Sequence, residues 1–528
     1  MSSIFKKNYY FYIFLFIYIP IGSYLSITNG ITHDEYHEQL NWEINLSAII
    51  NFLKDGSYNN LLNYGDRYHG IGFHIISQPI QIITYKFISN LNSLSLYGGY
   101  LVSKHLSVFL LFSISGIFFY LLCLKISQNL IFSIISSLLY LLYPYLFGHA
   151  QFNPKDIPFL SFWLINSYIS LTLIESLFYE NQIKIKRIII FSFLTAFLIS
   201  IRISGVIIFV QYFIGIIVLF NIKKIDITNF IKNNLFIFFT FVTSLFIFIY
   251  LLNPILWHNP LEFLNSIKWM SKYFNDICTL TFGDCMRSLN LPSSYYFIWF
   301  FFKLPIIIII GILLFPFVEK KIFSEKLRSI YYLTLLISFF SILFIFIFKN
   351  IAIYDELRHV MFLVPMIFLV GLTNFFYFSK KLFYTFGSFV ILFFIIENVS
   401  LNPYQYTWLN SFAKLTDIQK NFEIDYWGVS NKNLARKIID YSKKNSINKN
   451  TCVYGDIYAK EFLLNDNFKC FKTYGQLDSA KVKPLFAYQI HRNVKRSDPK
   501  DCKLIWNETY QYSFYNRNIS VGKLWFCN

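Results

Sequence analysis

Charge is scarce in this chain. Only 14% of its 528 residues are charged, whereas 55% are hydrophobic and 21% are aromatic. An ordinary soluble domain has about 25% charged residues, so this composition excludes one. Hydrophobic runs recur from the N-terminus to about residue 400, and many reach the roughly 20 residues that cross a bilayer as a helix. The sequence therefore predicts an all-α polytopic membrane module.

The first hydrophobic run lacks the features of a cleaved signal peptide. It extends over about 9–28, is long, and has no small-residue exit of the A-x-A kind. It follows Lys6 and Lys7 and precedes many more runs, so we expect an uncleaved first transmembrane helix. About eleven spans are expected in all, at 9–28, 98–124, 129–147, 157–179, 188–201, 203–221, 234–252, 295–318, 330–348, 359–378 and 382–400.

Acidic residues are the scarcer charge, 29 against 47 basic ones. The net charge of +18 does not indicate a nucleic-acid partner, because the basic residues concentrate in alternate short connections between spans. By the positive-inside rule these connections face the cytoplasm, so everything after residue 400 lies outside a cell (inner) membrane. The basic residues concerned are Lys6, Lys7, Lys125, Lys184, Lys186, Arg187, Lys223, Lys224, Lys232, Lys320, Lys321, Lys326, Arg328, Lys380 and Lys381.

The composition changes after residue 400. Hydrophobic density drops there, Lys, Asn and Asp rise, and residues 401–528 have the size of a small globular domain. We therefore expect a transmembrane module over 1–400 and an extracytoplasmic soluble α/β domain over 401–528.

No cysteine pair has the C-x-x-C spacing typical of a zinc site. Six of the seven cysteines fall on the expected outer side, where disulfides persist. Cys278 and Cys285 would close a short loop, and the four cysteines of the tail allow three pairings. Disulfides are the favoured interpretation.

The first outer loop, 29–97, holds two segments with apolar residues at helical spacing, about 38–53 and 76–87. Both are expected to be helices that lie in the membrane interface. They would form a collar, a platform that holds Asp34 and Glu35 at the depth of a lipid headgroup, or both.

The motif HDEYHE, residues 33–38, has three interpretations. His33 and His37 are four apart, as in zinc metalloproteases, but Asp34 stands where that pattern needs Glu and no third ligand is marked. The motif would otherwise be a solvated acidic face. The favoured interpretation makes a carboxylate the general base for an acceptor hydroxyl or amine, with its neighbour tuning it or holding a cation.

Further charges stand at expected outer helix ends. Lys155 and Asp156 lie in a rigid turn between two prolines, although Asp156 would also serve as a helix cap. Arg202 interrupts a long apolar stretch, which marks a site unless its side chain snorkels to the surface. Arg358, beside His359, suits a phosphate because of its planar fork, and an ion pair with Asp355 or Glu356 is the alternative.

The expected spans are nearly free of charge. A transporter would place polar groups near the midplane, and none is visible there. A flippase or exporter of lipid-linked saccharide, which needs a polar pathway, is therefore the second choice. A non-catalytic sensor would leave the crowded first loop unexplained. The pattern favours a surface-facing active site that handles a lipid phosphate.

These motifs together resemble the C-type glycosyltransferase (GT-C) superfamily, and within it the bacterial branch similar to protein O-mannosyltransferases. The resemblance rests on the Asp-Glu pair after the first span, FNPKDIPF (152–159), IRISG (201–205), NPILWHNP (253–260) and Arg-His at 358–359. NPYQYTWLN (402–410) and IDYWGVSNKNLARKI (424–438) extend it to about residue 440.

The resemblance implies transfer of a sugar, with inversion, from a polyprenyl-phosphate donor to a protein, lipid or glycan acceptor at the outer face. It implies Asp34 as the catalytic base, Glu35 as its neighbour in the motif and Asp156 as the second acidic residue. The cations available for the donor phosphate are Lys155, Arg202, Arg358 and His359. The reaction needs no cofactor, and a divalent metal is optional. The tail departs from eukaryotic relatives, so the acceptor is open.

Overall fold

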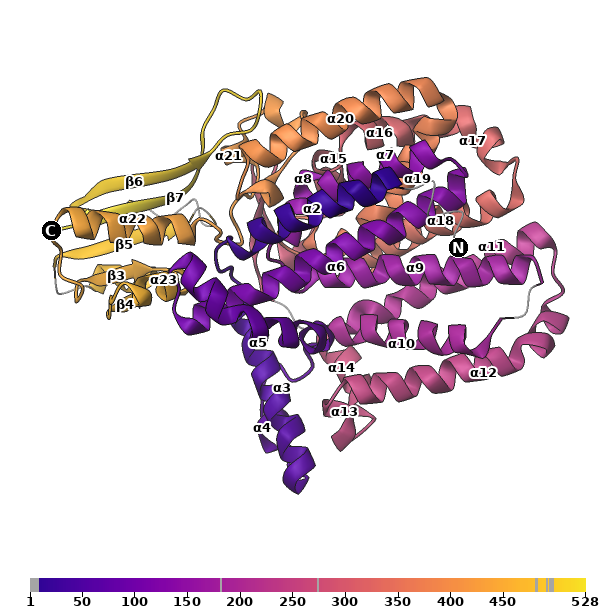
Figure 1. Ribbon diagram of the computed structural model, residues 1–528, viewed down its shortest axis with the longest axis horizontal. Coiled ribbons are helices and arrows are strands. Elements are labelled where there is room, and N and C mark those ends of the chain that lie inside the picture. The colour runs from indigo at the N-terminus through magenta and orange to yellow at the C-terminus, as the bar shows by residue number, and fades with distance from the viewer. Residues whose placement is uncertain (1–8, 181–182, 273–274, 480–482, 491, 493–497) are drawn as a thin grey trace.

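A computed structural model describes residues 9–180, 183–272, 275–479, 483–490, 492 and 498–528 (Figure 1). A bundle of long helices occupies most of the chain, and a small sheet domain lies at one end of it. We call this end, which also carries α3 (Glu35–Asp55) and α5 (Gly72–Asn92), the domain end. The chain is a polytopic membrane protein by the length and composition of its helices.

Among the described residues, eight helices are long and apolar enough to cross a membrane, or ten if each of two bent pairs counts as one span. The bent pairs are α7–α8 (Leu130–Leu142 and Pro144–Ala150) and α15–α16 (Ser294–Lys303 and Ile306–Leu313). The eight are α2 (Tyr9–Ile27), α6 (Leu96–Ser127), α9 (Asp156–Phe178), α11 (Ile208–Lys223) with its preceding 3-10 turn η1 (Ile203–Ile207), α12 (Ile227–Leu252), α18 (Lys326–Phe348), α19 (Val364–Phe378) with η3 (Arg358–Leu363), and α20 (Lys380–Ser400).

The helix α10 (Ile185–Ile201) lies at one of the eleven spans expected but is not among the eight, nor among the ten if both bent pairs are spans. It has 17 residues and is too short to be counted with the others. It ends where the sequence predicted a break, because Arg202 adopts an extended backbone (φ −146°) and η1 begins at Ile203. Arg202 therefore stands between two helices at the domain end.

The most buried span is α19. In the most apolar stretch of its segment Arg358–Phe378, 94% of the residues are buried inside the protein, against 11% in the corresponding stretch of α12. A helix that is apolar all round suits either a protein interior or lipid. α19 therefore forms the centre of the bundle, and α12 presents its apolar side chains outward.

The helix α3 projects from the domain end at a steep angle to the long helices (Figure 1), and α5 packs against α6. Their bounds contain the two segments that the sequence predicted to be helical. Each exposes apolar side chains, for example Leu53 at 75% and Ile83 at 79%. Helices with these features suit a membrane interface, and that location stays a prediction.

The C-terminal sheet has five strands in the order β4-β3-β5-β7-β6. β3 is parallel to both β4 and β5, whereas β7 is antiparallel to β5 and β6. Helices α22 and α23 pack with it. The bounds are β3 (Cys452–Gly455), β4 (Phe471–Thr473), β5 (Leu485–Ile490), β6 (Cys502–Tyr510), β7 (Ile519–Cys527), α22 (Asn431–Lys444) and α23 (Lys460–Asn465).

The segment between α20 and α22 belongs to the core of the bundle. Leu401, Tyr406 and Trp427 are fully buried in the same apolar cluster as the central helices. The sheet domain is also tied to the first loop, because Tyr36 donates a hydrogen bond of 2.8 Å to Glu461. The tail is therefore docked on the domain end.

Three disulfides are present among the described residues, as the cysteine positions predicted. They join Cys278 to Cys285, Cys452 to Cys470 and Cys502 to Cys527. The first joins the antiparallel strands β1 (Cys278–Thr281) and β2 (Asp284–Arg287), and the others join strands or strand ends of the sheet domain. Cys123 is a buried free thiol.

This pairing sets the number of reactive thiols. After denaturation without reductant, we expect one labelled thiol per chain, Cys123, and all seven cysteines labelled once reductant is added. Intact-mass measurement after maleimide labelling counts them. Cys123→Ser should leave none before reduction. Three or more labelled thiols in the oxidised wild-type protein would contradict the pairing.

Candidate active site at the domain end

Six charged side chains from distant parts of the chain form one ion network at the domain end. They come from the first loop, the start of α9, the break after α10, the loop before α19 and the sheet domain. We use the name ion network for these six residues: Asp34, Asp156, Arg202, Asp355, Arg358 and Arg492.

Arg358 is at the centre of the ion network. Its Nε lies 3.3 Å from Asp156 Oδ2, its Nη1 lies 3.3 Å from Asp355 Oδ2, and its Nη2 pairs with Asp34. The guanidinium carbon lies 4.4 Å from the centre of the Trp427 ring, a cation–π distance. The side chain is only 6% exposed. The sequence left open whether Arg358 pairs with Asp355 or serves a phosphate, and the ion pair exists here.

Asp156 links two arginines. Its Oδ1 pairs with Arg202 and its Oδ2 faces Arg358, while the Asn153 amide donates to Oδ2 at 2.8 Å. The Asp156 side chain is 1% exposed, and the two guanidiniums beside it offset the cost of burying its charge. Asp156 also begins α9, but it is the side chain of Asn153 that accepts from the Asp156 backbone N–H, at 2.9 Å.

The loop before α19 is strained. Asp355 (φ 54°) and Glu356 (φ 67°) are consecutive non-glycine residues in the left-handed region. Such conformations persist where the surroundings hold them, and they cluster at functional sites. Here the Asp355 N–H donates to Thr279 Oγ1 at 2.9 Å, and Lys303 Nζ lies 2.7 Å from Glu356 Oε2.

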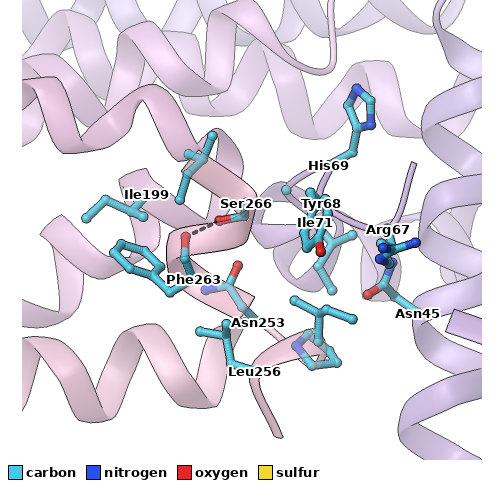
Figure 2. A pocket seen from close by; sticks show the side chains of 14 residues that line it. Asn45, Arg67, Tyr68, His69, Ile71, Ile199, Asn253, Leu256, Phe263 and Ser266 are labelled. Atoms are coloured by element: carbon cyan, nitrogen blue, oxygen red, sulfur yellow. Dashed lines mark hydrogen bonds between the residues drawn. The ribbon is translucent and has the colours of Figure 1, made fainter. Parts of the chain in front are cut away.

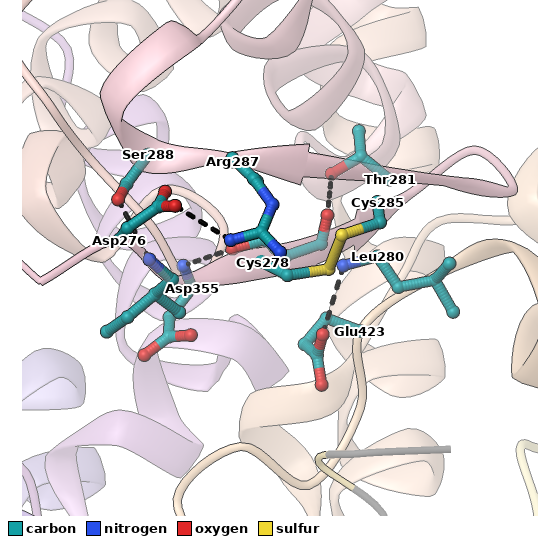
Figure 3. The surroundings of a disulfide bond; sticks show 11 residues. Asp276, Cys278, Leu280, Thr281, Cys285, Arg287, Ser288, Asp355 and Glu423 are labelled. Carbon is teal, nitrogen blue, oxygen red and sulfur yellow. Dashed lines mark hydrogen bonds and ion pairs between the residues drawn. A yellow bond between two sulfur atoms is a disulfide. The ribbon is translucent and has the colours of Figure 1, made fainter. Parts of the chain in front are cut away.

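The β1–β2 hairpin supplies part of this support. Figure 3 shows Asp355 and Glu423 beside the strand that carries Cys278 and Leu280. Glu423 accepts a hydrogen bond of 3.0 Å from the Leu280 N–H. Burial raises the pKa of Glu423 to about 8 and that of Glu356 to about 7. The Cys278–Cys285 disulfide thus stabilises a hairpin that positions the loop of Asp355.

Arg492 connects the sheet domain to the network. Its Nη2 lies 3.0 and 3.1 Å from the two carboxylate oxygens of Asp355, and its Nη1 donates to the Tyr426 carbonyl at 2.9 Å. The ion network therefore contains three carboxylates and three guanidiniums. Only one of its carboxylates is accessible, because the Asp34 side chain is 33% exposed and those of Asp156 and Asp355 are 1% exposed.

Glu35 lies apart from the ion network. It is 2% exposed and accepts from the Thr32 N–H at 2.7 Å and the Thr32 hydroxyl at 2.8 Å. Its Oε2 lies 3.0 Å from His105 Nε2 on α6. These contacts fix the start of α3, so the geometry gives Glu35 a structural role next to Asp34. His359 is also outside the set, with its Nδ1 3.5 Å from the Tyr354 N–H.

Lys155 belongs to a second buried cluster. Its Nζ lies 3.1 and 3.0 Å from the two carboxylate oxygens of Glu38 and 3.1 Å from the Gly70 carbonyl. Burial would raise the pKa of Glu38, but Lys155 and His74 outweigh it and hold that pKa well below its usual range. The sequence grouped Lys155 with Arg202 and Arg358, whereas in the structure Glu38 holds it.

The two histidines of HDEYHE point to different partners. His33 Nε2 lies 3.3 Å from Asp456 of the sheet domain, and burial lowers the pKa of His33 to about 3, so its ring is neutral. His37 lies near Asp66 and His69 instead. The two rings do not share a ligand site, which removes the basis for the metalloprotease interpretation.

An open pocket lies beside this end of the molecule, between the α4–α5 connection and the segment around α13 (Ile255–His258) and α14 (Glu262–Met270). Figure 2 shows Arg67 and Tyr68 on one side and Phe263 and Ser266 on the other. None of the six residues of the ion network lines it.

No protein-family model and no curated protein matches the chain. Of the seven residues that the sequence singled out, Asp34, Asp156, Arg202 and Arg358 meet in one network.

Sequence reasoning missed three contributors to the site. Nothing marked Arg492 in the tail, and Trp427 entered only within the segment 424–438 that carries the resemblance. Asp355 was visible only as an alternative partner of Arg358. A strained left-handed pair has no reliable sequence signal when neither residue is Gly or Asn.

The raised pKa of Glu423 makes stability depend on pH. The folded carboxyl keeps its proton up to about pH 8, whereas the unfolded one loses it near pH 4.5, so this stabilising contribution is lost as pH rises towards 8. Histidines held neutral act oppositely, but only below their ordinary pKa of 6.5. Between pH 6.5 and 8, Lys432 acts in the opposite direction to Glu423, because burial lowers the pKa of Lys432 to about 7. As pH rises through this range, Tm should therefore fall more, or rise less, in the wild type than in Glu423→Gln. Equal slopes in differential scanning fluorimetry would contradict this assignment.

Proposed function

We propose that the protein is a membrane glycosyltransferase that moves a sugar from a polyprenyl-phosphate donor to an acceptor at the domain end. The observation that carries the proposal is the pairing of one accessible carboxylate, Asp34, with a buried guanidinium, Arg358. The first is suited to accept a proton and the second to hold a phosphate.

The chemistry needs one base and a cationic site. The acceptor oxygen or nitrogen attacks the anomeric carbon, and the bond from that carbon to the phosphate oxygen breaks. Asp34 accepts the acceptor's proton, and polyprenyl phosphate leaves with the electron pair of the broken bond. Unlike a hydrolase, which protonates its leaving group, the enzyme only has to stabilise a phosphate that is already anionic.

The existing ion pairs mean that a donor phosphate must compete with a carboxylate for Arg358. The ion network has equal numbers of positive and negative groups, so a phosphate adds charge that must replace a carboxylate. Asp34 is the carboxylate best placed to be replaced, because it is the one exposed to solvent. We infer that the phosphate replaces Asp34 at Arg358 Nη2. Asp34 is then free to act as the base.

The other residues have supporting roles in this proposal. Asp156, which also pairs with Arg202, orients the Arg358 fork, and so does Asp355, which also pairs with Arg492. Glu35 fixes the start of α3 and so the position of Asp34. Lys155 and His359 contact other groups, and we assign them no direct contact with the donor phosphate.

The proposal also includes the fold superfamily, the membrane and the side of the membrane on which the site lies. A GT-C architecture, a cell (inner) membrane location and a site on its extracytoplasmic side agree with the arrangement of loops and disulfides. The acceptor is a protein, a lipid or a glycan. The mechanism needs no cofactor.

Asp34→Asn tests the base. The change keeps the size of the side chain and removes the proton acceptor, so turnover should fall by about two to four orders of magnitude with normal expression. Sugar transfer by purified protein measures it. The matched control is Asp440→Asn, which alters an exposed carboxylate on α22 and should leave turnover unchanged. Near-normal turnover in Asp34→Asn would exclude Asp34 as the base.

Arg358 variants test the phosphate site. Arg358→Ala removes the charge that pairs with two buried aspartates and should lower stability by about 3–5 kcal/mol, whereas Arg358→Lys should lose less. Donor affinity should weaken in the same order, at least about tenfold for alanine, a cost of about 1.4 kcal/mol. Equilibrium binding of a polyprenyl-phosphate sugar measures affinity separately from Tm. If a folded Arg358→Ala protein binds the donor normally, the phosphate role is wrong.

A further inference from the structure

His37, Asp66 and His69 meet in the loop region between α2 and α5. One candidate ligand atom from each residue lies within 4.8 Å of the other two. His37 Nε2 is 3.9 Å from Asp66 Oδ2, and His69 Nδ1 is 3.7 Å from Asp66 Oδ1. His37 lies on α3, and the other two lie in the connection between α4 (Asn59–Leu62) and α5.

The separations are close to those of a metal site. In a tetrahedral Zn²⁺ site with bonds of about 2.0–2.1 Å, neighbouring ligand atoms are about 3.3–3.4 Å apart. The pairs here need to approach by about half an ångström, with a larger movement where the spacing is widest. Rotation of these side chains supplies this, since 40% of His37, 25% of Asp66 and 13% of His69 is exposed.

A second set of hydrogen bonds prepares the His37 ring for a metal. The Tyr64 hydroxyl donates to Asn41 Oδ1 at 2.6 Å, which turns the Asn41 amide nitrogen towards His37 Nε2, 3.3 Å away. Because the amide N–H donates, His37 Nε2 must be the unprotonated ring nitrogen. Its lone pair is the group that a metal ion would bind. An incoming ion would take the place of the amide hydrogen.

The donor set selects a class of ion. Two imidazole nitrogens and one carboxylate suit Zn²⁺ and its neighbours more than Mg²⁺ or Ca²⁺, which prefer oxygen ligands. No thiol is available among the described residues here, because six cysteines form disulfides and Cys123 is buried in α6. Three protein ligands also leave a fourth position open, as in zinc sites that bind water or substrate.

We propose that this loop binds one divalent transition ion of the Zn²⁺ class through His37, Asp66 and His69. The site stands independently of the sugar-transfer proposal. It adjoins the second buried cluster, because Gly70, which follows His69, accepts a hydrogen bond from Lys155. Figure 2 shows the His69 ring pointing away from the other labelled side chains of the pocket. The ion therefore ties α3 to the α4–α5 connection.

Metal content of the purified full-length protein tests the site. The protein is freed of any polyhistidine tag, stripped with a chelator, reloaded with Zn²⁺ and desalted. Mass spectrometry of the metal should find one equivalent in the wild type and at least a tenfold loss in His37→Ala, His69→Ala and Asp66→Asn. Co²⁺ in place of Zn²⁺ should give the visible absorption of a tetrahedral nitrogen–oxygen site, which the same variants lose.

The matched control is His33→Ala, which lies four residues before His37, ahead of α3, and faces Asp456. It should keep the full equivalent. Tyr64→Phe removes the hydroxyl that orients Asn41 and no ligand, so it should also keep the full equivalent. A metal-free wild type, or equal metal in the wild type and all three ligand variants, would overturn the proposal. Because no step uses sugar transfer, failure here and failure of the proposed function are distinguishable.

Discussion

A single buried cation determines the structure of the domain end. The guanidinium of Arg358 contacts carboxylates from three separate parts of the chain, Asp34, Asp156 and Asp355. Removing a buried charge from its partners costs several kcal/mol, because water no longer solvates the group that remains. One side chain therefore holds three parts of the chain together, the start of α3, the start of α9 and the loop before α19.

The balance of charge around Arg358 links binding to chemistry. Three arginines and three aspartates leave no spare positive charge for a phosphate. A donor must therefore compete with a carboxylate, and the exposed one is the residue proposed as the base. In this account the protein holds Asp34 in an ion pair until a phosphate arrives, so the base is freed only when its substrate is bound.

Part of this arrangement is predictable from the sequence, because charged residues are easily recognised within or beside long apolar segments. Arg202 was marked by its place in a hydrophobic stretch, and Asp34, Asp156 and Arg358 by their positions at helix ends. The sequence did not distinguish the residues of the ion network from their immediate neighbours in the chain. Glu35 and Lys155 adjoin Asp34 and Asp156, yet successive helical residues point about 100° apart, and each meets a different partner. Arg492 arrives from the tail by a long-range contact, which leaves no local pattern to read.

The most direct test of the account is product formation by the purified protein with a panel of radiolabelled polyprenyl-phosphate sugars. For at least one donor, release of polyprenyl phosphate should match transfer of sugar to an acceptor, one to one, and excess polyprenyl phosphate should inhibit it by occupying Arg358. Absence of both release and transfer across the panel, in protein that is folded and fully oxidised, would contradict the central claim.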